Sequence, residues 1–387
     1  MSLMRFRIGS ACHSLHLRQL CTSTSKSDNT HHLLISAFNK DTFQQHFFSI
    51  PIIHHPLSLG SKPTSLLTLT LPSSHPKGLN TSQYLNPFFL LHRHDYPHSN
   101  HAPILTYNPT TQQTLTLPHS LTSETETDTT LYAETHFGFD PLTNTHKVLR
   151  AEWTVAIPES NPRVSQMVCT VFTLGCRSNG SWRKVKINPE LPFHSTKYMS
   201  SGKSVCINGA IHWVTQFGNY IVAFDLKDEN FRLIPLPHNY KAENFKPLHF
   251  EFNRLIELGG CLALVDYKYS GDIYRGDEYI CQFWILKDYH NHVWVEEKIS
   301  VPFDFRINIY GKPIPIGTIP TGEILLEPFS WYVSCKDYPA CLLFYDMEGQ
   351  GFKKVDVTGL PKWVYNGRHS IIRAISVYEG ASNSIFA

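Results

Sequence analysis

The sequence has few charged residues, no long apolar run and no net charge of consequence. Charged residues make up 17% of the 387 residues, and 34 basic side chains nearly balance 32 acidic ones. This balance leaves no electrostatic surface of one sign that would attract nucleic acid or an anionic membrane. No run approaches the roughly 18 apolar residues that a membrane-spanning helix requires. We therefore expect a soluble chain that binds neither nucleic acid nor membrane.

Motifs for catalysis and for metal binding are also missing. The nine cysteines are odd in number and form no C-x-x-C pair, which favours reduced thiols over disulfides or zinc ligands. The sequence contains no phosphate-binding glycine loop, no G-x-S-x-G and no H-E-x-x-H. The histidine-rich stretch from His92 to His101 is interpreted as a solvated loop, because Arg93 would repel a cation. We expect no catalytic residue, no metal and no cofactor.

Short strands and tight turns are abundant instead. Aromatic residues reach 13% and prolines number 25, a composition that favours many strands joined by turns. Asn208-Gly209 is the dipeptide of a type I′ turn, so Lys203 to Ile207 is predicted to pair with Ala210 to Thr215. The apolar run from Tyr220 to Leu226 predicts a third strand, and Phe231 to Leu236 a fourth. Four antiparallel strands in this order form one blade of a β-propeller.

Three motifs in this region resemble a known family. They are the run Gly175 to Arg183, which ends in Ser-Trp-Arg, then Val-x-x-Asn-Gly-x-x-His-Trp ending at Trp213, and Phe-Asp-x-x-x-Glu-x-Phe ending at Phe231. In this order they resemble the F-box-associated interaction domain of plant F-box proteins. The resemblance covers roughly residues 30 to 375, and its framework positions here are Trp182, Asn208, Gly209, His212, Trp213, Phe224 and Asp225. Aromatic residues beside hairpin turns favour packing between blades over a ligand cage.

The fold class expected from the repeats is all-β, a kelch-like β-propeller of about six four-stranded blades over residues 31–387. The blade-like blocks span residues 31–55, 64–118, 131–187, 203–237, 255–299 and 312–358. Ser370 to Tyr378 alternates like a strand and is predicted to pair with the first block, which would close the ring. Seven blades remain an alternative, since residues 58–100 could form one blade or two. The irregular spacing predicts long loops on one rim.

Residues 1–30 admit two interpretations. Ser2 to Arg7 is similar to the second half of an F-box, a helical segment that docks a Skp-type adaptor of a cullin ubiquitin ligase. The resemblance implies a short helical extension in which Leu3, Phe6 and Ile8 contact the adaptor. The first half of the motif is missing, so we expect an incomplete adaptor surface; a shortened gene model would give the same sequence. The basic composition alternatively suits a mitochondrial or plastid presequence; otherwise we expect the cytoplasm or nucleus.

The function implied by the resemblance is recognition of a target protein, without chemistry, as the substrate receptor of a Skp-cullin-F-box ubiquitin ligase. The alternative is a propeller that binds a partner without recruiting a ligase, and an enzyme with a site dispersed over several blades ranks third. Irregular connections such as Tyr267 to Asp277 and Tyr310 to Pro315 are candidates for target contact, because loops carry most recognition.

Overall fold

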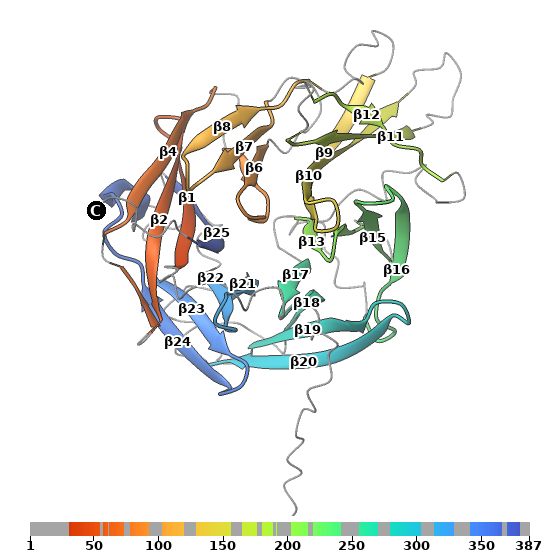
Figure 1. Ribbon diagram of the computed structural model, residues 1–387. Helices are drawn as coiled ribbons and strands as arrows, with labels where there is room; N and C mark the ends of the chain where they lie inside the picture. The colour runs from red at the N-terminus through yellow and green to blue at the C-terminus, as the bar shows by residue number, and fades with distance from the viewer. Residues whose placement is uncertain are drawn as a thin grey trace, which may run out of the picture.

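The strands form six sheets arranged in a ring (Figure 1). The computed structural model describes residues 31–54, 57–60, 62–72, 78–92, 103–119, 129–155, 165–175, 180–188, 191, 203–215, 220–240, 255–269, 279–302, 313–328, 341–365 and 370–379. The predicted all-β propeller with six blades is confirmed, and six replaces the alternative of seven. The expected helical extension falls within residues 1–30, outside the described residues. No helix in the described ranges is long and apolar enough to cross a membrane.

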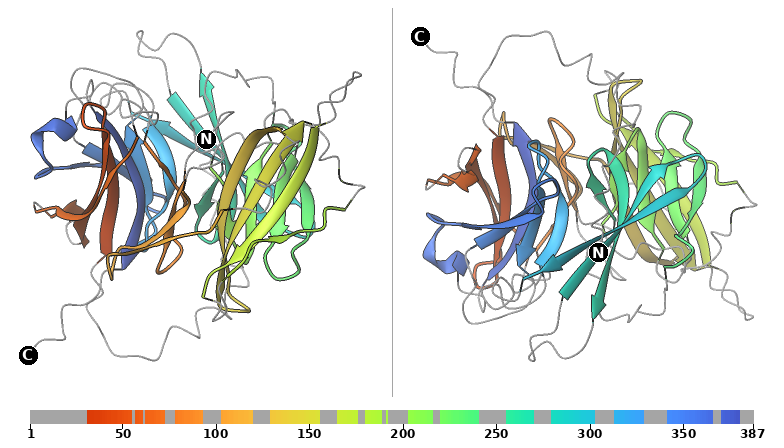
Figure 2. Two further views of the ribbon diagram at one scale, coloured as in Figure 1. Left: turned by 90° about the horizontal axis from the view of Figure 1, so that it is seen from above. Right: turned by 90° about the horizontal axis from the view of Figure 1, so that it is seen from below.

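Blade 1 combines the two ends of the described chain. It contains β1 (His31–Asn39), β2 (Gln44–His54), β3 (Leu57–Leu59), β4 (Thr64–Thr70) and β25 (Ser370–Glu379). Antiparallel pairing of β25 with β1 runs from His31 opposite Glu379 to Asn39 opposite Ser370. Figure 2 shows the red strands of this blade beside the blue C-terminal strand. The predicted closure of the ring is therefore confirmed, because the C-terminal strand β25 pairs with the first strand β1 in one sheet.

The other five blades each contain four strands in simple sequential order. Blade 2 contains β5 (Asn80–Thr81), β6 (Phe89–His92), β7 (Leu105–Asn108) and β8 (Gln113–Thr116); blade 3 contains β9 (Thr129–Asp140), β10 (Thr145–Val155), β11 (Ser165–Thr173) and β12 (Arg183–Lys184). Blade 4 contains β13 (Val205–Ile207), β14 (Ala210–Val214), β15 (Tyr220–Asp225) and β16 (Phe231–Pro235); blade 5 contains β17 (Leu255–Leu258), β18 (Cys261–Tyr269), β19 (Tyr279–Asp288) and β20 (Val293–Val301). Blade 6 contains β21 (Pro313–Thr318), β22 (Ile324–Pro328), β23 (Cys341–Asp346) and β24 (Gly351–Asp356), followed by a 3-10 helix at Lys362–Tyr365.

One predicted block was divided wrongly. Residues 64–118 were expected to form one blade, but β4 pairs with β2 in blade 1, and blade 2 begins only at Asn80. The reason is the length of β2. Its 11 residues expose more backbone hydrogen-bonding groups along one edge than one short strand can pair with. β4 pairs with the first half of β2 and β3 with the second half. Blade 1 therefore has five strands.

The same turn closes one hairpin in every blade. An Asn or Asp accepts a backbone hydrogen bond from the residue two positions later, and the residue four positions later has positive φ. The first residues of these turns are Asn39, Asn108, Asp140, Asp225, Asp288 and Asp346, and the positive-φ residues are Phe43, Gln112, Asn144, Glu229, His292 and Gln350. A short polar side chain mimics a backbone turn in this way, so each blade contains one local signal that positions a strand pair.

Most of the tight turns gather on one rim of the ring, whereas the Asn39 turn joins the second and third strands of blade 1 and lies at the opposite rim. Strands within a blade alternate in direction, so the turns after the first and third strands lie at the same rim. We call this side the turn rim; it includes the turns at 141–144, 208–209, 226–230, 289–292 and 347–350. The strand ends that flank the longest connections, before β13, β17 and β21, lie at the opposite side, the connection rim. The chain thus separates rigid turns from long connections.

The core lies between neighbouring blades. Packed clusters join blade 1 to blade 6, blade 3 to blade 4, blade 5 to blade 6 and blade 4 to blade 5. Two further clusters join blade 1 to blade 2 and blade 2 to blade 3. Each sheet is therefore covered on both faces, which explains the continuous apolar strands such as Ile221 to Phe224.

Candidate functional site

The framework residue Trp182 joins blade 3 to blade 2. Its side chain is buried and packs against Phe172, with ring centroids 5.4 Å apart. The indole Nε1 donates a hydrogen bond to the backbone oxygen of Pro118, which follows the outer strand of blade 2, over 2.7 Å. An indole with its one donor satisfied and both faces covered has no free surface for a ligand.

His212 and Trp213 connect blade 4 to both of its neighbours. They are consecutive on β14 and therefore face opposite sides of the sheet. Trp213 stacks on His136 of β9 in blade 3, with ring centroids 4.5 Å apart and an angle of 10° between the rings. On the other side, Nε2 of His212 lies 2.8 Å from the hydroxyl oxygen of Tyr289 in blade 5. Burial lowers the pKa of His212 to about 4, so its ring is neutral at physiological pH.

The remaining framework residues shape two turns of blade 4. Asn208 and Gly209 have φ of 52° and 75°, as the predicted type I′ turn requires. The carboxylate of Asp225 accepts hydrogen bonds from the backbone of the turn that follows it and from Arg232. Phe224 is fully buried and contacts the ring of Phe231. These residues hold the blade together, and none of them lines the cavity described below.

A close backbone approach at Gly138 sets the spacing of blades 3 and 4. A Cβ added to Gly138 would lie 2.7 Å from Ile211 Cγ1 and 2.7 Å from Leu226 Cδ1, both fully buried in blade 4. We expect Gly138→Ala to lower the free energy of unfolding by about 1–3 kcal/mol through overpacking, measured by thermal unfolding of the purified chain. Gly351→Ala is the matched control, because its nearest atom would be 3.9 Å away. Equal losses in both variants would contradict close packing as the cause.

Glu229 forms an ion-pair cluster that clamps the turn of blade 4 onto blade 3. Its Oε1 accepts a hydrogen bond from Nζ of Lys147 on β10 over 2.9 Å, and the guanidinium of Arg183 pairs with both carboxylate oxygens. Lys147 also donates to the backbone oxygen of Leu226. Burial alone would raise the pKa of Glu229, but the hydrogen bonds and charges of Arg183 and Lys147 outweigh it and lower the pKa. Sequence reasoning noted Glu229 in a motif without predicting these partners.

Other predicted positions fall partly or wholly outside the described residues. The adaptor residues Leu3, Phe6 and Ile8 belong to residues 1–30, which are not described. Of the two candidate target loops, residues 267–269 belong to β18 and residues 313–315 to β21, and the rest lies outside the described ranges. His92 ends β6, and residues 93–101 of the histidine-rich stretch are likewise not described. Within the described ranges, no group of three metal-ligating side chains occurs.

Residues 82–88, here called the axial segment, bring blade 2 into contact with blades 3 and 4. Oε1 of Gln83 accepts a hydrogen bond from the backbone N–H of Cys206 at the inner strand of blade 4, over 2.8 Å. The ring of His146 in blade 3 lies 3.1 Å from the backbone oxygen of Leu85. Sequence reasoning placed this stretch in the block 64–118 without predicting these contacts, because they join residues more than 60 positions apart.

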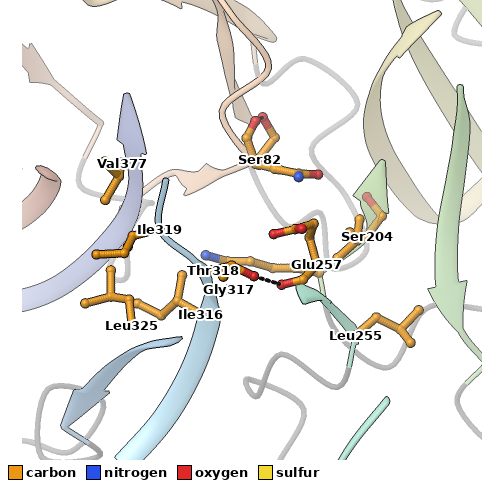
Figure 3. A pocket seen from close by; sticks show the side chains of 13 residues that line it. Ser82, Ser204, Leu255, Glu257, Ile316, Gly317, Thr318, Ile319, Leu325 and Val377 are labelled. Atoms are coloured by element: carbon orange, nitrogen blue, oxygen red, sulfur yellow. Dashed lines mark hydrogen bonds between the residues drawn. The ribbon is translucent and has the colours of Figure 1, made fainter. Parts of the chain in front are cut away.

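A cavity of about 80 Å³ lies beside the axial segment, where the inner strands converge (Figure 3). Its walls come from the axial segment, from the start of β13, from β17, from β21 and β22, and from β25, so five blades contribute. Figure 3 shows the apolar side chains of Ile319 and Leu325 on one side, and Ser204 and Glu257 on the other. The bond to Cys206 uses only Oε1 of Gln83, and among the described residues its Nε2, on the cavity wall, has no hydrogen-bond partner.

Lys203 is the cation of this cavity. Burial lowers the pKa of Lys203; the charge of Glu327 opposes that shift, and the charge of Arg373 adds to it. No hydrogen bond or ion pair joins the Lys203 ammonium to any part of the chain that the structure describes. Lys203 is partly buried, so water and the charge of Glu327 both act on its ammonium. A group with a shifted pKa that lines a cavity is a candidate for a binding site.

Comparison with known proteins places this fold in a plant protein group. Residues 32–377 match the family described as "F-box associated beta propeller domain". An F-box/LRR-repeat protein of Arabidopsis thaliana is 25% identical over 227 residues, covering 58% of this chain and 49% of that protein. F-box protein DOR, also of Arabidopsis thaliana, is 26% identical over 247 residues, covering 61% of this chain and 53% of that protein. The chain thus spans about half the length of the curated relatives it matches.

Solved structures resemble the chain only loosely. A putative 6-phosphogluconolactonase from Bacteroides fragilis aligns with 87% of this chain and 98% of its own, at 10% identity and a TM-score of 0.39. A likeness at this level carries no conclusion about activity.

Proposed function

The chain belongs to the F-box associated β-propeller family, and from this membership we propose that it recognises a target protein for a Skp-cullin-F-box ubiquitin ligase. The match over residues 32–377 carries the proposal, since it includes all six blades. The matched relatives are themselves named F-box proteins. In this role the propeller holds a target near the ligase and does no chemistry itself.

We assign target contact to the connection rim. The turn rim consists of short turns closed by Asx side chains and positive-φ residues, which leave little freedom to adapt to a partner. The strand ends at the connection rim flank the longest stretches between strands, and loops on a rigid scaffold are the usual place for recognition. The inter-blade contacts of Trp182, His212 and Trp213 keep that scaffold rigid.

Contact with the Skp-type adaptor is proposed for the segment before β1. The similarity of residues 2–7 to the second half of an F-box supports Leu3, Phe6 and Ile8 as its apolar contacts. An amphipathic helix in a groove depends on a few such anchors.

A binding assay with purified Skp-type adaptor tests the ligase role. We expect the full chain to bind with a dissociation constant of about 1 μM or tighter, and the triple variant Leu3→Asp, Phe6→Asp, Ile8→Asp to lose at least about a hundredfold in affinity. Lys353→Ala, an exposed change on β24, is the control and should bind normally. A version with a complete F-box placed before Ser2 calibrates the assay. Binding by that version alone would overturn the proposal and favour an interaction module that recruits no ligase.

A further inference from the structure

We propose that the axial cavity binds a small oxyanion, a carboxylate or a phosphate, with Lys203 as its counter-charge. The site is formed by described residues of the inner strands and the axial segment. Lys203 and Ser204 end the connection before β13, whereas adaptor contact is proposed for residues 1–30, so the anion site and the adaptor contact can be tested separately.

The cavity is large enough for such a ligand. About 80 Å³ exceeds several times the roughly 10–15 Å³ that one water molecule requires on a comparable measure. A carboxylate or phosphate group, with a few waters, would fit this space. A larger organic anion would not fit inside and could place only its charged end there.

Three donor groups on the cavity wall have no hydrogen-bond partner in the described ranges. They are the ammonium of Lys203, Nε2 of Gln83 and the hydroxyl of Ser204. Gln83 is held in place by its own Oε1, which accepts the N–H of Cys206, so its amide NH₂ is oriented without being used. The oriented amide of Gln83, together with the ammonium and hydroxyl donors that line the same cavity, matches the acceptor oxygens of an anion.

The acceptors on the same wall are mostly occupied. The hydroxyl of Thr318 donates to the backbone oxygen of Glu257 and accepts the N–H of Gly259. Oε1 of Glu257 accepts the N–H of Gly260 over 2.5 Å, which ties this carboxylate to the β17–β18 turn. The negative charge of Glu257 still repels an anion in the cavity. Removing that charge should therefore tighten binding, whereas removing the charge of Lys203 should weaken it.

Isothermal titration of the full chain with inorganic phosphate, and separately with acetate, tests the site at an ionic strength held constant with chloride. We expect saturable binding of at least one probe, and the tighter probe identifies the kind of oxyanion. Lys203→Met should weaken binding by about tenfold or more, as expected for loss of a charge-assisted hydrogen bond. Gln83→Glu, which keeps the acceptor for Cys206 but replaces the amide donors by a charge, should weaken it similarly.

Two further variants complete the test. Glu257→Gln keeps the acceptor for Gly260 and removes the opposing charge, so it should tighten binding by about threefold to tenfold. Lys353→Met, on the outer strand of blade 6, should leave binding unchanged. Phosphate also stabilises folded proteins without binding to a site, because it is excluded from their surface. That effect would be the same in every variant, so only a difference between variants indicates binding in the cavity. Absence of saturable binding in the unmodified chain, or equal binding by a folded Lys203→Met variant, would overturn the proposal.

Discussion

Replacing Trp213 by alanine will lower the free energy of unfolding by about 3–5 kcal/mol. Trp213 is 1% exposed, and its ring stacks on His136 across the junction of blades 3 and 4. Truncation would leave a cavity beside the buried His136 and Glu134, whose side chains lie 3.4 Å apart. Both the lost contacts and the void contribute to the cost.

Urea unfolding, followed in parallel by tryptophan fluorescence and far-UV circular dichroism, measures this loss. Coincident transitions are needed for a two-state free energy in a chain of this size. Trp363→Ala is the matched control, because Trp363 is only partly buried and should cost less than about 2 kcal/mol. A loss at Trp213 no larger than at Trp363 would show that the junction of blades 3 and 4 does not limit stability.

Glu229→Gln is expected to cost about 2–4 kcal/mol at neutral pH, because it leaves the ammonium of Lys147 without its counter-charge. The Lys147 and Glu229 side chains are 9% and 16% exposed, so water compensates the loss poorly. Arg183, at 49% exposed, belongs to the same cluster but remains well solvated. Arg183→Gln should therefore cost less than about 1 kcal/mol. A cost at Arg183 equal to that at Glu229 would contradict this division.

The Glu229 effect depends on pH in a defined direction. The pKa of Glu229 is lower in the folded chain than its ordinary value of 4.5. The stabilisation is therefore complete above pH 4.5 or so and is lost as the pH falls through the folded-state pKa. Unfolding of the unmodified chain and of Glu229→Gln should converge in acid. The double variant Lys147→Met, Glu229→Gln should cost less than the sum of the two single changes, since the residues interact directly.

Local sequence determined the strands and turns of this protein. Asn208-Gly209 predicted a type I′ hairpin because few dipeptides accept positive φ at both central positions, and the structure has φ of 52° and 75° there. The apolar run from Tyr220 predicted a strand covered on both faces, and β15 is buried over four successive residues. The repeated Asx turns, of which Asn39 and Asp288 belong to the first and fifth blades, follow equally local rules.

Only the tertiary structure decided which strands share a blade and which side chains meet. β4 pairs in blade 1 because part of the edge of β2 is otherwise unpaired. The pairing of β4 therefore depends on the length of a different strand, which the residues of β4 do not indicate. Lys147 reached Glu229 across 82 residues of sequence, and His212 reached Tyr289 across 77. The cavity around Lys203 exists because ring closure brings five blades together. Turn and strand preferences act over a few residues, whereas these contacts depend on the geometry of the closed ring.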